Sequence, residues 1–492
     1  MRTFSRKTGY LIGGLALGFF WLGPIISCVG NPSRPADVSP VFVPSGVVVP
    51  ASASGSALTS PAGVEESAGT AKMENARLSL ARCIQIALEN NRQLLIAEEG
   101  RVKAKGRVTE SMSQCYPNLT ANLSYRRVDQ VTDFSASALT PKITIGSLDN
   151  YSAEASLKQT IYQGGRVNAM IESAQLGQQL AEMQFRDAKE AVIFLVTKAY
   201  DDVLLSQETL NINQKSLVNA QEHLNNVRLS HQQGVASNYE LLRAEVQVTN
   251  LKAVVIQSES NLHLAKLSLL RAMGAPVEDG SVTIELTDPL TPTIQSVNLA
   301  QALETAFQLR PDLQQARLAV EMQKKNITIA KSDLRPNISL LAATGEEKPS
   351  RYGFGENVWG DYWNAGIAIS FPLFEGGRVR GQVIQERATL HQNEISLDDT
   401  AERVRYEVKQ AVLSLNDTAE LIKSQSENVR QAEEGLRLVD LGFKNGVNTQ
   451  LEVLDTQVSL DVARKNYLTA VYNYNLAHLM LEKSMGVLEN KP

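Results

Sequence analysis

Four short stretches of the chain alternate between apolar and polar residues. The alternating stretches are residues 118–125, 152–162, 337–340 and 364–371. In the second stretch, for example, Leu157 and Ile161 share an apolar face with polar residues between them. A period of two residues is typical of β-strands that have one apolar and one hydrophilic face. The pattern predicts two β-hairpins, over residues 117–162 and 336–373.

Six longer stretches have the periodicity of helices. They cover approximately residues 79–113, 166–230, 238–272, 298–333, 379–441 and 449–484. The two longest would each reach about 100 Å, far beyond an average globular helix of ~11–12 residues. The other four are about half as long, so two of them stacked end to end would match one long helix. Ordinary long coiled coils would explain these helices but not the two amphipathic hairpins between them.

The order of elements occurs twice because the chain contains an internal duplication. Four segments of the first half recur in the same order in the second half. The offset is 219 positions for residues 78–94 and 117–118, and 212 positions for residues 164–166 and 231–248. The first copy therefore carries seven extra residues before its Gly-Gly pair (219 minus 212), as a loop tolerates. We expect two structural repeats, residues 76–290 and 291–486, and a short tail at 487–492.

One motif ends the second strand of each hairpin, as IYQGGRV in the first repeat and LFEGGRV in the second. Its members are Gly164, Gly165 and Arg166, and Gly376, Gly377 and Arg378. The chain must turn there from a strand into a helix, and glycine permits backbone angles that are costly for other residues. Two generic turns are the simpler interpretation, but recurrence at matched positions favours a shared junction at which the arginine starts the helix.

The N-terminus has the features of a targeting segment. Basic residues precede an apolar run from Tyr10 to Ser27, and the sequence IISC ends at Cys28. This resembles a bacterial lipobox, in which the cysteine is acylated and becomes the new N-terminus. Residues 1–27 are then a signal peptide and 28–75 a lipidated tether rich in Pro, Ser and Ala; an uncleaved membrane anchor is the alternative.

Charge and chemistry exclude several classes of function. The net charge is only −5 and no basic block stands out, so we expect no nucleic-acid partner. The chain lacks a P-loop, a nucleophile elbow, a zinc-protease motif and Rossmann glycines, so we expect no enzyme and no cofactor besides a lipid on Cys28. The five histidines are scattered, which predicts no metal site. Cys83 lies within the helix predicted over about residues 79–113 and Cys115 lies at its end, which places them too far apart for a disulfide.

The duplication, the two Gly-Gly-Arg junctions, the Pro-Asn strand starts and the FKNGVNTQLEVLDTQ turn together resemble the TolC-like outer membrane efflux proteins, over about residues 76–486. The resemblance implies an α+β membrane protein. Three chains of four strands each would form a twelve-stranded β-barrel, continued by a long periplasmic helical barrel. The lipobox further resembles the acylated branch of the family, held in the outer membrane by lipid as well.

The implied function is an exit duct for efflux. A homotrimer would dock with a periplasmic adaptor protein bound to an inner-membrane pump and conduct substrates passively through the outer membrane. A channel for type I protein secretion is the alternative within the family. A structural coiled-coil protein of the envelope, without a pore, is the alternative from another class.

The resemblance places a periplasmic gate at the tips of the helical hairpins, where Gly234-Val235 and Gly446-Val447 mark the chain reversals. Glu452 and Asp455 are three residues apart, hence on one helix face, and would form two carboxylate rings in a trimer. Two solvated surface acids are the simpler interpretation. Residues matched to the family's tip contacts are Glu240 and Phe443, with Asn448 where an arginine is expected and Arg243 as a substitute cation.

The lipobox predicts that Cys28→Ser abolishes palmitate labelling of the protein, because the thiol is the acylated group. The β-hairpins should still insert into the outer membrane. Metabolic labelling with palmitate, compared between the wild type and the variant, measures this. Undiminished labelling of the variant would contradict acylation at Cys28.

Overall fold

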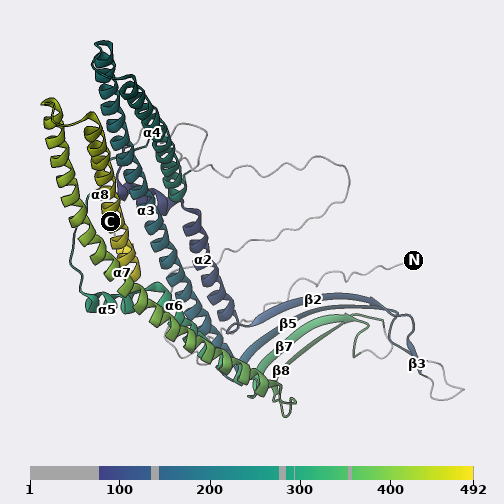
Figure 1. Cartoon of the computed structure of the whole chain (residues 1–492). Helices are drawn as coiled ribbons and strands as arrows, with labels where there is room; N and C mark the ends of the chain where they lie inside the picture. The colour runs from purple at the N-terminus through teal and green to yellow at the C-terminus, as the bar shows by residue number, and fades with distance from the viewer. Residues whose placement is uncertain (1–76, 135–142, 276–283, 293, 353–356, 491–492) are drawn as a thin grey trace, which may run out of the picture. The chain divides into compact units, whose positions relative to one another are not determined.

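A computed structural model describes residues 77–490 except residues 135–142, 276–283, 293 and 353–356. The predicted signal peptide, the tether and Cys28 lie outside the described residues. Each repeat contains a short helix, a second helix, a β-hairpin, a very long helix and a return helix, in that order (Figure 1). Among the described residues, no helix combines the length and the apolar character needed to cross a membrane.

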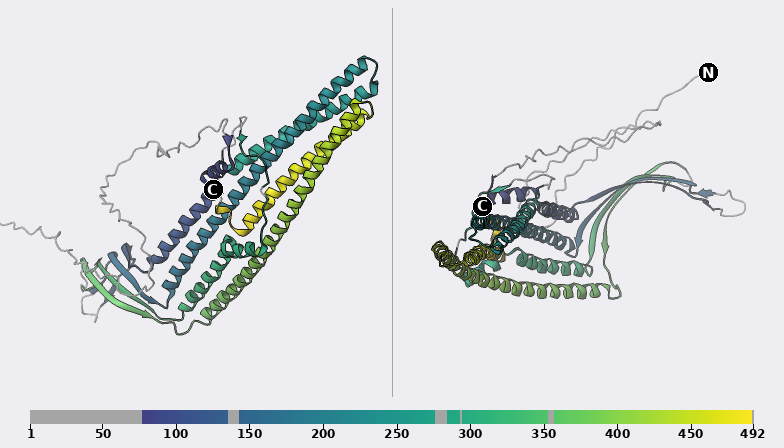
Figure 2. Two further views of the ribbon diagram at one scale, coloured as in Figure 1. Left: turned by 90° about the vertical axis from the view of Figure 1, so that its left-hand side faces the viewer. Right: turned by 45° about the horizontal axis from the view of Figure 1, so that its top comes forward.

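The two repeats match in the lengths of all their helices. The first contains α1 (Leu80–Asn90), α2 (Arg92–Ser113), β2 (Asn118–Arg127), β5 (Asp149–Gln163), α3 (Arg166–Gln232) and α4 (Asn238–Met273). The second contains α5 (Leu299–Leu309), α6 (Pro311–Ser332), β7 (Asn337–Lys348), β8 (Gly360–Ser370), α7 (Arg378–Lys444) and α8 (Gln450–Met485). Helices α3 and α7 each have 67 residues and so extend about 100 Å. Helices α3 and α8 contact each other, which places the two helical hairpins side by side (Figure 2).

Two of the six predicted helices are wrong, because 79–113 and 298–333 each consist of two helices. The first breaks at Asn91, whose side chain caps α2 by accepting from the Gln93 N–H and donates to the Ala272 carbonyl. The second breaks at Arg310, because the following Pro311 disfavours a helical conformation in the residue before it. Cys83 and Cys115 therefore do not share a helix, and both are free thiols.

The end of a return helix packs against each of these two helix breaks. Gly274 and Gly486 cap α4 and α8 in the left-handed conformation, with φ of 74° and 70°. A Cβ at Gly274 would lie 2.6 Å from the Asn90 carbonyl oxygen, and one at Gly486 would lie 2.9 Å from the Arg310 Cα. The interruption of one helix thus makes room for the close approach of another, in both repeats.

The four long strands form one antiparallel sheet in the order β2-β5-β7-β8 (Figure 1). Register opposes apolar to apolar residues, as in the pairs Leu119 with Leu157 and Ile338 with Ile369. Polar residues oppose one another on the other face, where the Thr120 and Ser156 hydroxyls hydrogen-bond at 2.8 Å. The predicted division into an apolar and a hydrophilic face is therefore present in these strand pairs, with exceptions between β5 and β7 where Gln159 opposes Leu340 and Lys158 opposes Leu341.

The predicted face of Ile161 is wrong because β5 contains a bulge. Register shifts between Thr160 and Tyr162, so Tyr162 rather than Ile161 pairs with Ile338. A bulge inserts one unpaired residue and reverses the alternation beyond it. The sequence pattern continued unbroken through this point and gave no sign of the shift.

Two small sheets were not predicted, since strands of two or three residues carry no readable period. Strands β1 (Arg77–Leu78) and β6 (Glu285–Leu286) pair in parallel, and β3 (Thr132–Phe134) pairs antiparallel with β4 (Ile143–Ile145).

Two apolar clusters hold the helices together. One gathers Val196 and Leu269 from α3 and α4, and the other gathers Val408 and Tyr474 from α7 and α8. Leu488, in the 3-10 helix η1 (Leu488–Asn490), joins the first cluster although it follows the second repeat. The next residue, Glu489, accepts hydrogen bonds from Arg186 and Lys189 on α3 at 2.8 and 3.1 Å. The end of the second repeat is thus fastened to the long helix of the first.

One buried carboxyl group makes the stability of this region sensitive to pH. Glu190 on α3 is 3% exposed, and its Oε1 has no hydrogen-bond partner among the described residues. Burial, with the neighbouring Asp187 charge adding, raises the pKa of Glu190 to about 7. The native state then keeps a proton that the unfolded chain releases near pH 4.5, so stability falls as pH rises from about 4.5 to 7.

Glu190→Gln should therefore be more stable than the wild type at pH 8 and nearly equal to it at pH 5. The difference at pH 8 is expected to be about 3 kcal/mol, because a tenfold change in proton affinity corresponds to about 1.4 kcal/mol. Thermal unfolding followed by circular dichroism measures this. The matched control is Glu402→Gln, since Glu402 is the repeat-related residue and its side chain is 71% exposed. A stability gain for Glu190→Gln that is equal at both pH values would contradict titration of this carboxyl group.

Candidate functional site: the hairpin tips and the strand–helix junctions

Both helical hairpins reverse through the same turn. Gly234 and Gly446 have φ of 77° and 69°, which glycine adopts without strain. The following valine N–H donates to a carbonyl five residues earlier, from Val235 to Ser230 at 2.9 Å and from Val447 to Gly442 at 2.8 Å. This is the bond of a Schellman motif, which satisfies carbonyls at the end of a helix. Both valine side chains are 81% exposed, so each tip presents an apolar side chain to its surroundings.

A capping box begins the return helix at each tip. The Ser237 N–H and hydroxyl donate to the Glu240 carboxylate at 2.7 and 3.1 Å, while the Glu240 N–H donates to the Ser237 hydroxyl. Thr449 and Glu452 repeat this arrangement 212 positions later. Two predicted gate residues, Glu240 and Glu452, are therefore the same position of the duplicated unit. The S-x-x-E and T-x-x-E spacing is a readable signal for these caps, although neither cap was predicted from the sequence.

Asn448 has a definite role where an arginine was expected. Its Nδ2 donates to the Glu452 carboxylate at 3.0 Å, and this bond, with that from the Thr449 N–H, lowers the pKa of Glu452. Glu452 is thus held ionised. Asn448 also packs against Gly442, where a Cβ would lie only 1.8 Å from the amide oxygen. The Asn448 side chain therefore occupies space that is open only because residue 442 is a glycine.

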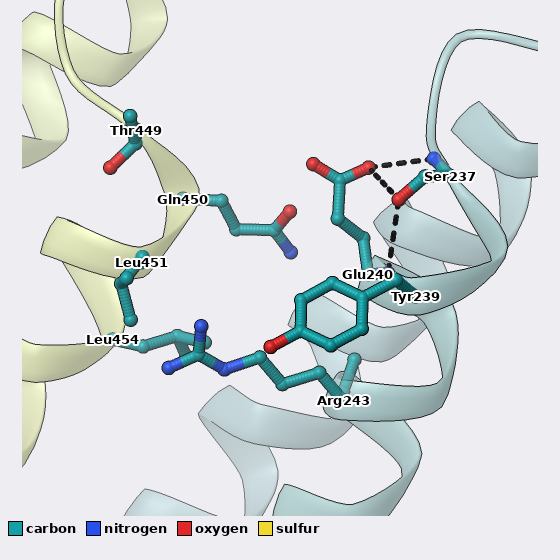
Figure 3. A pocket seen from close by; sticks show the side chains of 9 residues that line it. Ser237, Tyr239, Glu240, Arg243, Thr449, Gln450, Leu451 and Leu454 are labelled. Carbon is teal, nitrogen blue, oxygen red and sulfur yellow. Dashed lines mark hydrogen bonds between the residues drawn. The ribbon is translucent and has the colours of Figure 1, made fainter.

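The charged tip residues separate into two groups. A cavity of about 200 Å³ lies between the starts of α4 and α8, with Tyr239, Glu240 and Arg243 on one side and Gln450, Leu451 and Leu454 on the other (Figure 3). Glu452 and Asp455 do not line this cavity; both side chains are exposed, as is Phe443 on α7. Among the described residues, neither Arg243 nor Asp455 forms an ion pair. The structure therefore brings Glu240 and Arg243 together and leaves Glu452 and Asp455 on another surface.

Gln450 connects the two hairpins near their tips. Its amide contacts the ring Nε2 of His223 on α3. Burial lowers the pKa of His223, so the imidazole is neutral at pH 7 and can take either role in this contact. Neither residue was singled out in the sequence, because a contact between residues 227 positions apart leaves no local pattern.

At the opposite end of the long helices, all four glycines of the Gly-Gly-Arg motifs adopt the left-handed conformation. Their φ values are 62° and 84° in the first motif and 59° and 87° in the second. Gly164 also meets a steric limit, since a Cβ there would lie 2.7 Å from both the Ser332 carbonyl oxygen and the Arg335 Cβ. Gly376 has open space at the same position in the second motif.

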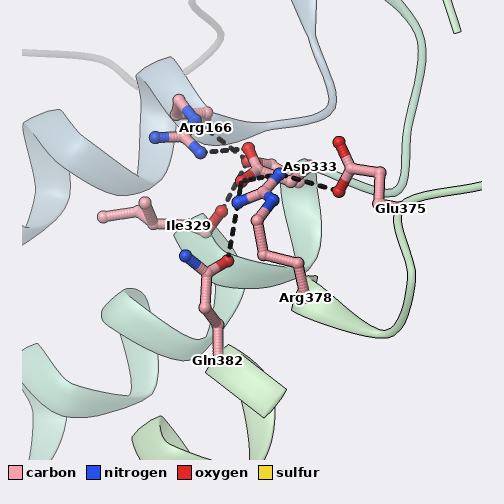
Figure 4. A network of polar contacts seen from close by, with 7 residues as sticks. Arg166, Ile329, Asp333, Glu375, Arg378 and Gln382 are labelled. Atoms are coloured by element: carbon pink, nitrogen blue, oxygen red, sulfur yellow. Dashed lines mark hydrogen bonds and ion pairs between the residues drawn. The ribbon is translucent and has the colours of Figure 1, made fainter. Parts of the chain in front are cut away.

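The two motif arginines meet on one carboxylate (Figure 4). Arg166 binds Asp333 and donates to the Ser332 hydroxyl at 3.2 Å. Arg378 donates to Asp333 at 3.3 Å and to Glu375 at 2.7 Å. Asp333, at the end of α6, therefore ties the start of both long helices to the start of β7. Asp333 was not predicted as part of this junction, because its partners are 167 and 45 positions away in the sequence.

No group of three or more metal-ligating side chains comes together within the described residues. Each repeat therefore has two distinctive ends. One is a hairpin tip with charged residues and an exposed valine, and the other is the junction between a long helix and the amphipathic sheet.

Comparison with known proteins gives the same family for both repeats. The family model described as "Outer membrane efflux protein" matches residues 83–275 and 302–487. The outer membrane protein TolC of Vibrio cholerae is 24% identical over 418 residues, covering 84% of this chain and 92% of its own length. The proteases secretion protein PrtF of Dickeya chrysanthemi is 23% identical over 421 residues, covering 83% and 88%.

A solved structure, that of the Campylobacter jejuni CmeC outer membrane channel, shares the fold with a TM-score of 0.70 at 16% identity, covering 83% of this chain and 85% of that one. Two of these three proteins are described as outer membrane proteins, and PrtF is described as a secretion protein. Because the family model matches more than half of the residues and both of its segments fall on the two repeats, the chain belongs to the outer membrane efflux protein family.

Proposed function

We propose that the chain is the outer membrane exit duct of a tripartite efflux system. The observation that carries this function is a sheet whose apolar face is exposed while it is joined directly to two helices of 67 residues. Leu123 on this face is 85% exposed, and Ile367 and Ile369 on β8, at the opposite edge of the sheet, are exposed as well. Exposed apolar surface of this extent marks an interaction site, and on a strand that alternates apolar and polar residues it suits lipid on one side and water on the other.

Aromatic side chains at both ends of the strands support a membrane position. At the end far from the helices, the Tyr125 and Tyr151 rings lie 5.0 Å apart and the Tyr151 and Trp359 rings 6.0 Å apart. At the end near the helices, Tyr162 and Phe371 are exposed. Aromatic girdles of this kind flank the apolar band of outer membrane β-barrels.

The functional unit would be a homotrimer. Four strands are too few to enclose a water-filled pore, whereas twelve strands from three chains would close one. The helices would continue the pore into the periplasm for about 100 Å. A lipid on Cys28 would add a second attachment to the outer membrane.

The hairpin tips would dock with a periplasmic adaptor protein that is bound to an inner-membrane pump. The exposed Val235 and Val447 side chains and the cavity between the tips provide apolar contacts for such a partner. The same tips would form the gate. Glu452 and Asp455 would line the narrow aqueous path, with Glu240, Arg243, Asn448 and Phe443 in contacts that hold the tips closed.

Protein secretion is the second candidate, because the proteases secretion protein PrtF and the probable efflux pump outer membrane protein TtgC of Pseudomonas putida are both 23% identical to this chain. Both functions require an open pore, unlike a structural coiled-coil protein of the envelope. Single-channel conductance of the purified protein in a planar bilayer tests this directly. Absence of any conducting events from correctly assembled protein would refute the duct.

Leu123→Arg should impair assembly in the outer membrane, whereas Asn122→Arg on the adjacent hydrophilic face should not. An arginine facing lipid near the bilayer midplane costs about 2–4 kcal/mol, and one facing water costs little. Heat-resistant oligomer in outer membrane fractions is the measure, and the neighbouring residue is the matched control. Equal tolerance of both substitutions would argue against lipid contact at this face.

Glu452→Gln combined with Asp455→Asn should lower the selectivity of the channel for cations. Crowded carboxylates concentrate cations, since unit charges a few Å apart interact by about 4 kcal/mol at an effective dielectric constant near 20. Glutamine is chosen because it also serves in a capping box, so α8 should start normally. Reversal potential in a salt gradient is the measurement.

Arg243→Gln is the matched control, because it removes a positive charge at the position of the first repeat that corresponds to Asp455, 212 residues later. It should increase cation selectivity if the two positions face one path. Unchanged reversal potentials in both variants would show that these residues do not line the conducting path.

A further inference from the structure

Two basic side chains lie on the hydrophilic face of the sheet. Lys158 on β5 is directly opposite Asn118 of β2, which belongs to this face. Arg126 follows Asn122 by four residues on β2, and positions an even number of residues apart share one face of a strand. Both basic side chains are exposed, and neither forms an ion pair among the described residues. Two positive charges on this face are therefore available to solutes.

The carboxylates on this face do not neutralise Lys158. Glu347 accepts hydrogen bonds from the Arg351 guanidinium at 3.0 and 3.1 Å, so these two charges compensate each other. Glu154 accepts a hydrogen bond from the Tyr362 hydroxyl and lies four residues from Lys158 along β5, a distance of about 13 Å. That distance exceeds the Debye length of about 8 Å at physiological ionic strength. The field of the Lys158 ammonium group therefore persists around it.

An apolar side chain lies beside Lys158 on the same face. Leu341 of β7 is directly opposite Lys158, and the Cβ atoms of such pairs are about 4.5–5.5 Å apart. The methylene groups of a lysine often cover an apolar neighbour, which is the simpler interpretation. Leu341 nevertheless remains 39% exposed, and Gly366, its partner on β8, has open space where a Cβ would lie. This row of the sheet thus offers a cation, an apolar surface and room beside them.

The strands do not require a lysine and a leucine at these two places. The positions related by the duplication carry Ser370 instead of Lys158, and Asn122 instead of Leu341. Small polar side chains therefore suffice at the same places of the other hairpin. The combination of a lysine and a leucine in one row needs another reason, and contact with a solute supplies one.

We propose that Lys158 and Leu341 form a binding site for organic anions, meaning solutes that carry a carboxylate or sulfonate group on a compact apolar body. The ammonium group of Lys158 binds the charged group, and the apolar body lies on Leu341 in the space left by Gly366. The inference rests on the proposed function, because this face meets passing solutes only if it lines the duct, and it names a substrate class for that duct. Conduction needs binding that is weak enough for release, and one exposed charge beside one partly exposed leucine meets this condition.

Thiol labelling measures the electrostatic potential at this site in full-length protein carrying Cys83→Ala and Cys115→Ser. Asn118→Cys places a thiol directly opposite Lys158, and the same protein without it is the blank. Labelling rates are compared for an anionic sulfonate and a cationic trimethylammonium methanethiosulfonate reagent. A unit charge about 6 Å away in water changes the local concentration of a monovalent ion about threefold, in opposite directions for the two signs. Lys158→Gln should therefore lower the ratio of anionic to cationic rates about tenfold at low salt.

Two further variants control this measurement. Lys348→Gln makes the same chemical change on the apolar face, where Lys348 is opposite Tyr151, and should leave the ratio unchanged. Lys158→Arg keeps the charge and should keep the ratio of the wild type. The difference should vanish at 1 M salt, where the Debye length is about 3 Å. Equal ratios in Lys158→Gln and Lys348→Gln would overturn the site. Assembled protein whose Asn118→Cys thiol reacts with neither reagent would overturn the water-filled duct of the proposed function itself.

Protection by a solute tests the class of ligand and needs no substitution of the site residues. Naphthalene-2-sulfonate should slow the anionic labelling of Asn118→Cys severalfold at a concentration at which methanesulfonate, with the same charge and little apolar surface, does not. Leu341→Ser should abolish this difference, whereas Leu340→Ser, on the opposite face of β7, should preserve it. Equal protection by the two sulfonates, or protection that survives Leu341→Ser, would overturn the apolar part of the site. No protection by naphthalene-2-sulfonate would overturn the site as a whole.

Discussion

The constraint on which the structure depends is that its sheet is incomplete within one chain. Strands β5 and β7 each pair with a strand on both sides, apart from irregularities such as the bulge at Ile161, but β2 and β8 each have one side without a strand among the described residues. Buried or lipid-exposed backbone groups without partners are costly, so a sheet in an apolar medium must close on itself. The open edges need further strands to pair with their backbone groups. The exposed apolar face needs an apolar environment such as lipid.

The duplication shows one way to meet this requirement, because strands of different repeats already pair within the chain, as β5 does with β7. It also explains where the two repeats diverge. Asp333 receives both motif arginines, yet the corresponding residue in the first repeat is Gln114. The internal junction is therefore held by ion pairs, and in the pair of Arg166 with Asp333 both side chains are about a quarter exposed. Gln114, as a neutral amide, cannot form such an ion pair. Partly buried ion pairs that include hydrogen bonds fix the relative positions of their residues more strictly than exposed ion pairs do.

Local periodicity was sufficient to predict the long helices, the amphipathic strands and the duplicated order from the sequence. It failed where one residue interrupts a regular pattern, as at Asn91 and at the bulge beside Ile161. Pro311 was a readable signal for the second helix break and was overridden by the apolar period around it. Asp333 and the contact of Gln450 with His223 could not be predicted, because they join segments that only the folded chain brings together.

At the hairpin tips, the glutamates at the repeat-related positions 240 and 452 can serve both as helix caps and as charges near the proposed path. Glu240 and Glu452 both accept the N–H groups at the start of a helix, so a structural need alone explains why each is acidic. Three residues later the repeats differ, with Arg243 in one and Asp455 in the other. In a ring of six repeats these would alternate in sign at one level. The net charge there would then depend on which side chains reach the path, because equal numbers of guanidinium and carboxylate groups cancel at a distance. Selectivity would therefore be set by the carboxylates of the caps, and the hydrogen bonds from Asn448 and the Thr449 N–H keep that of Glu452 ionised.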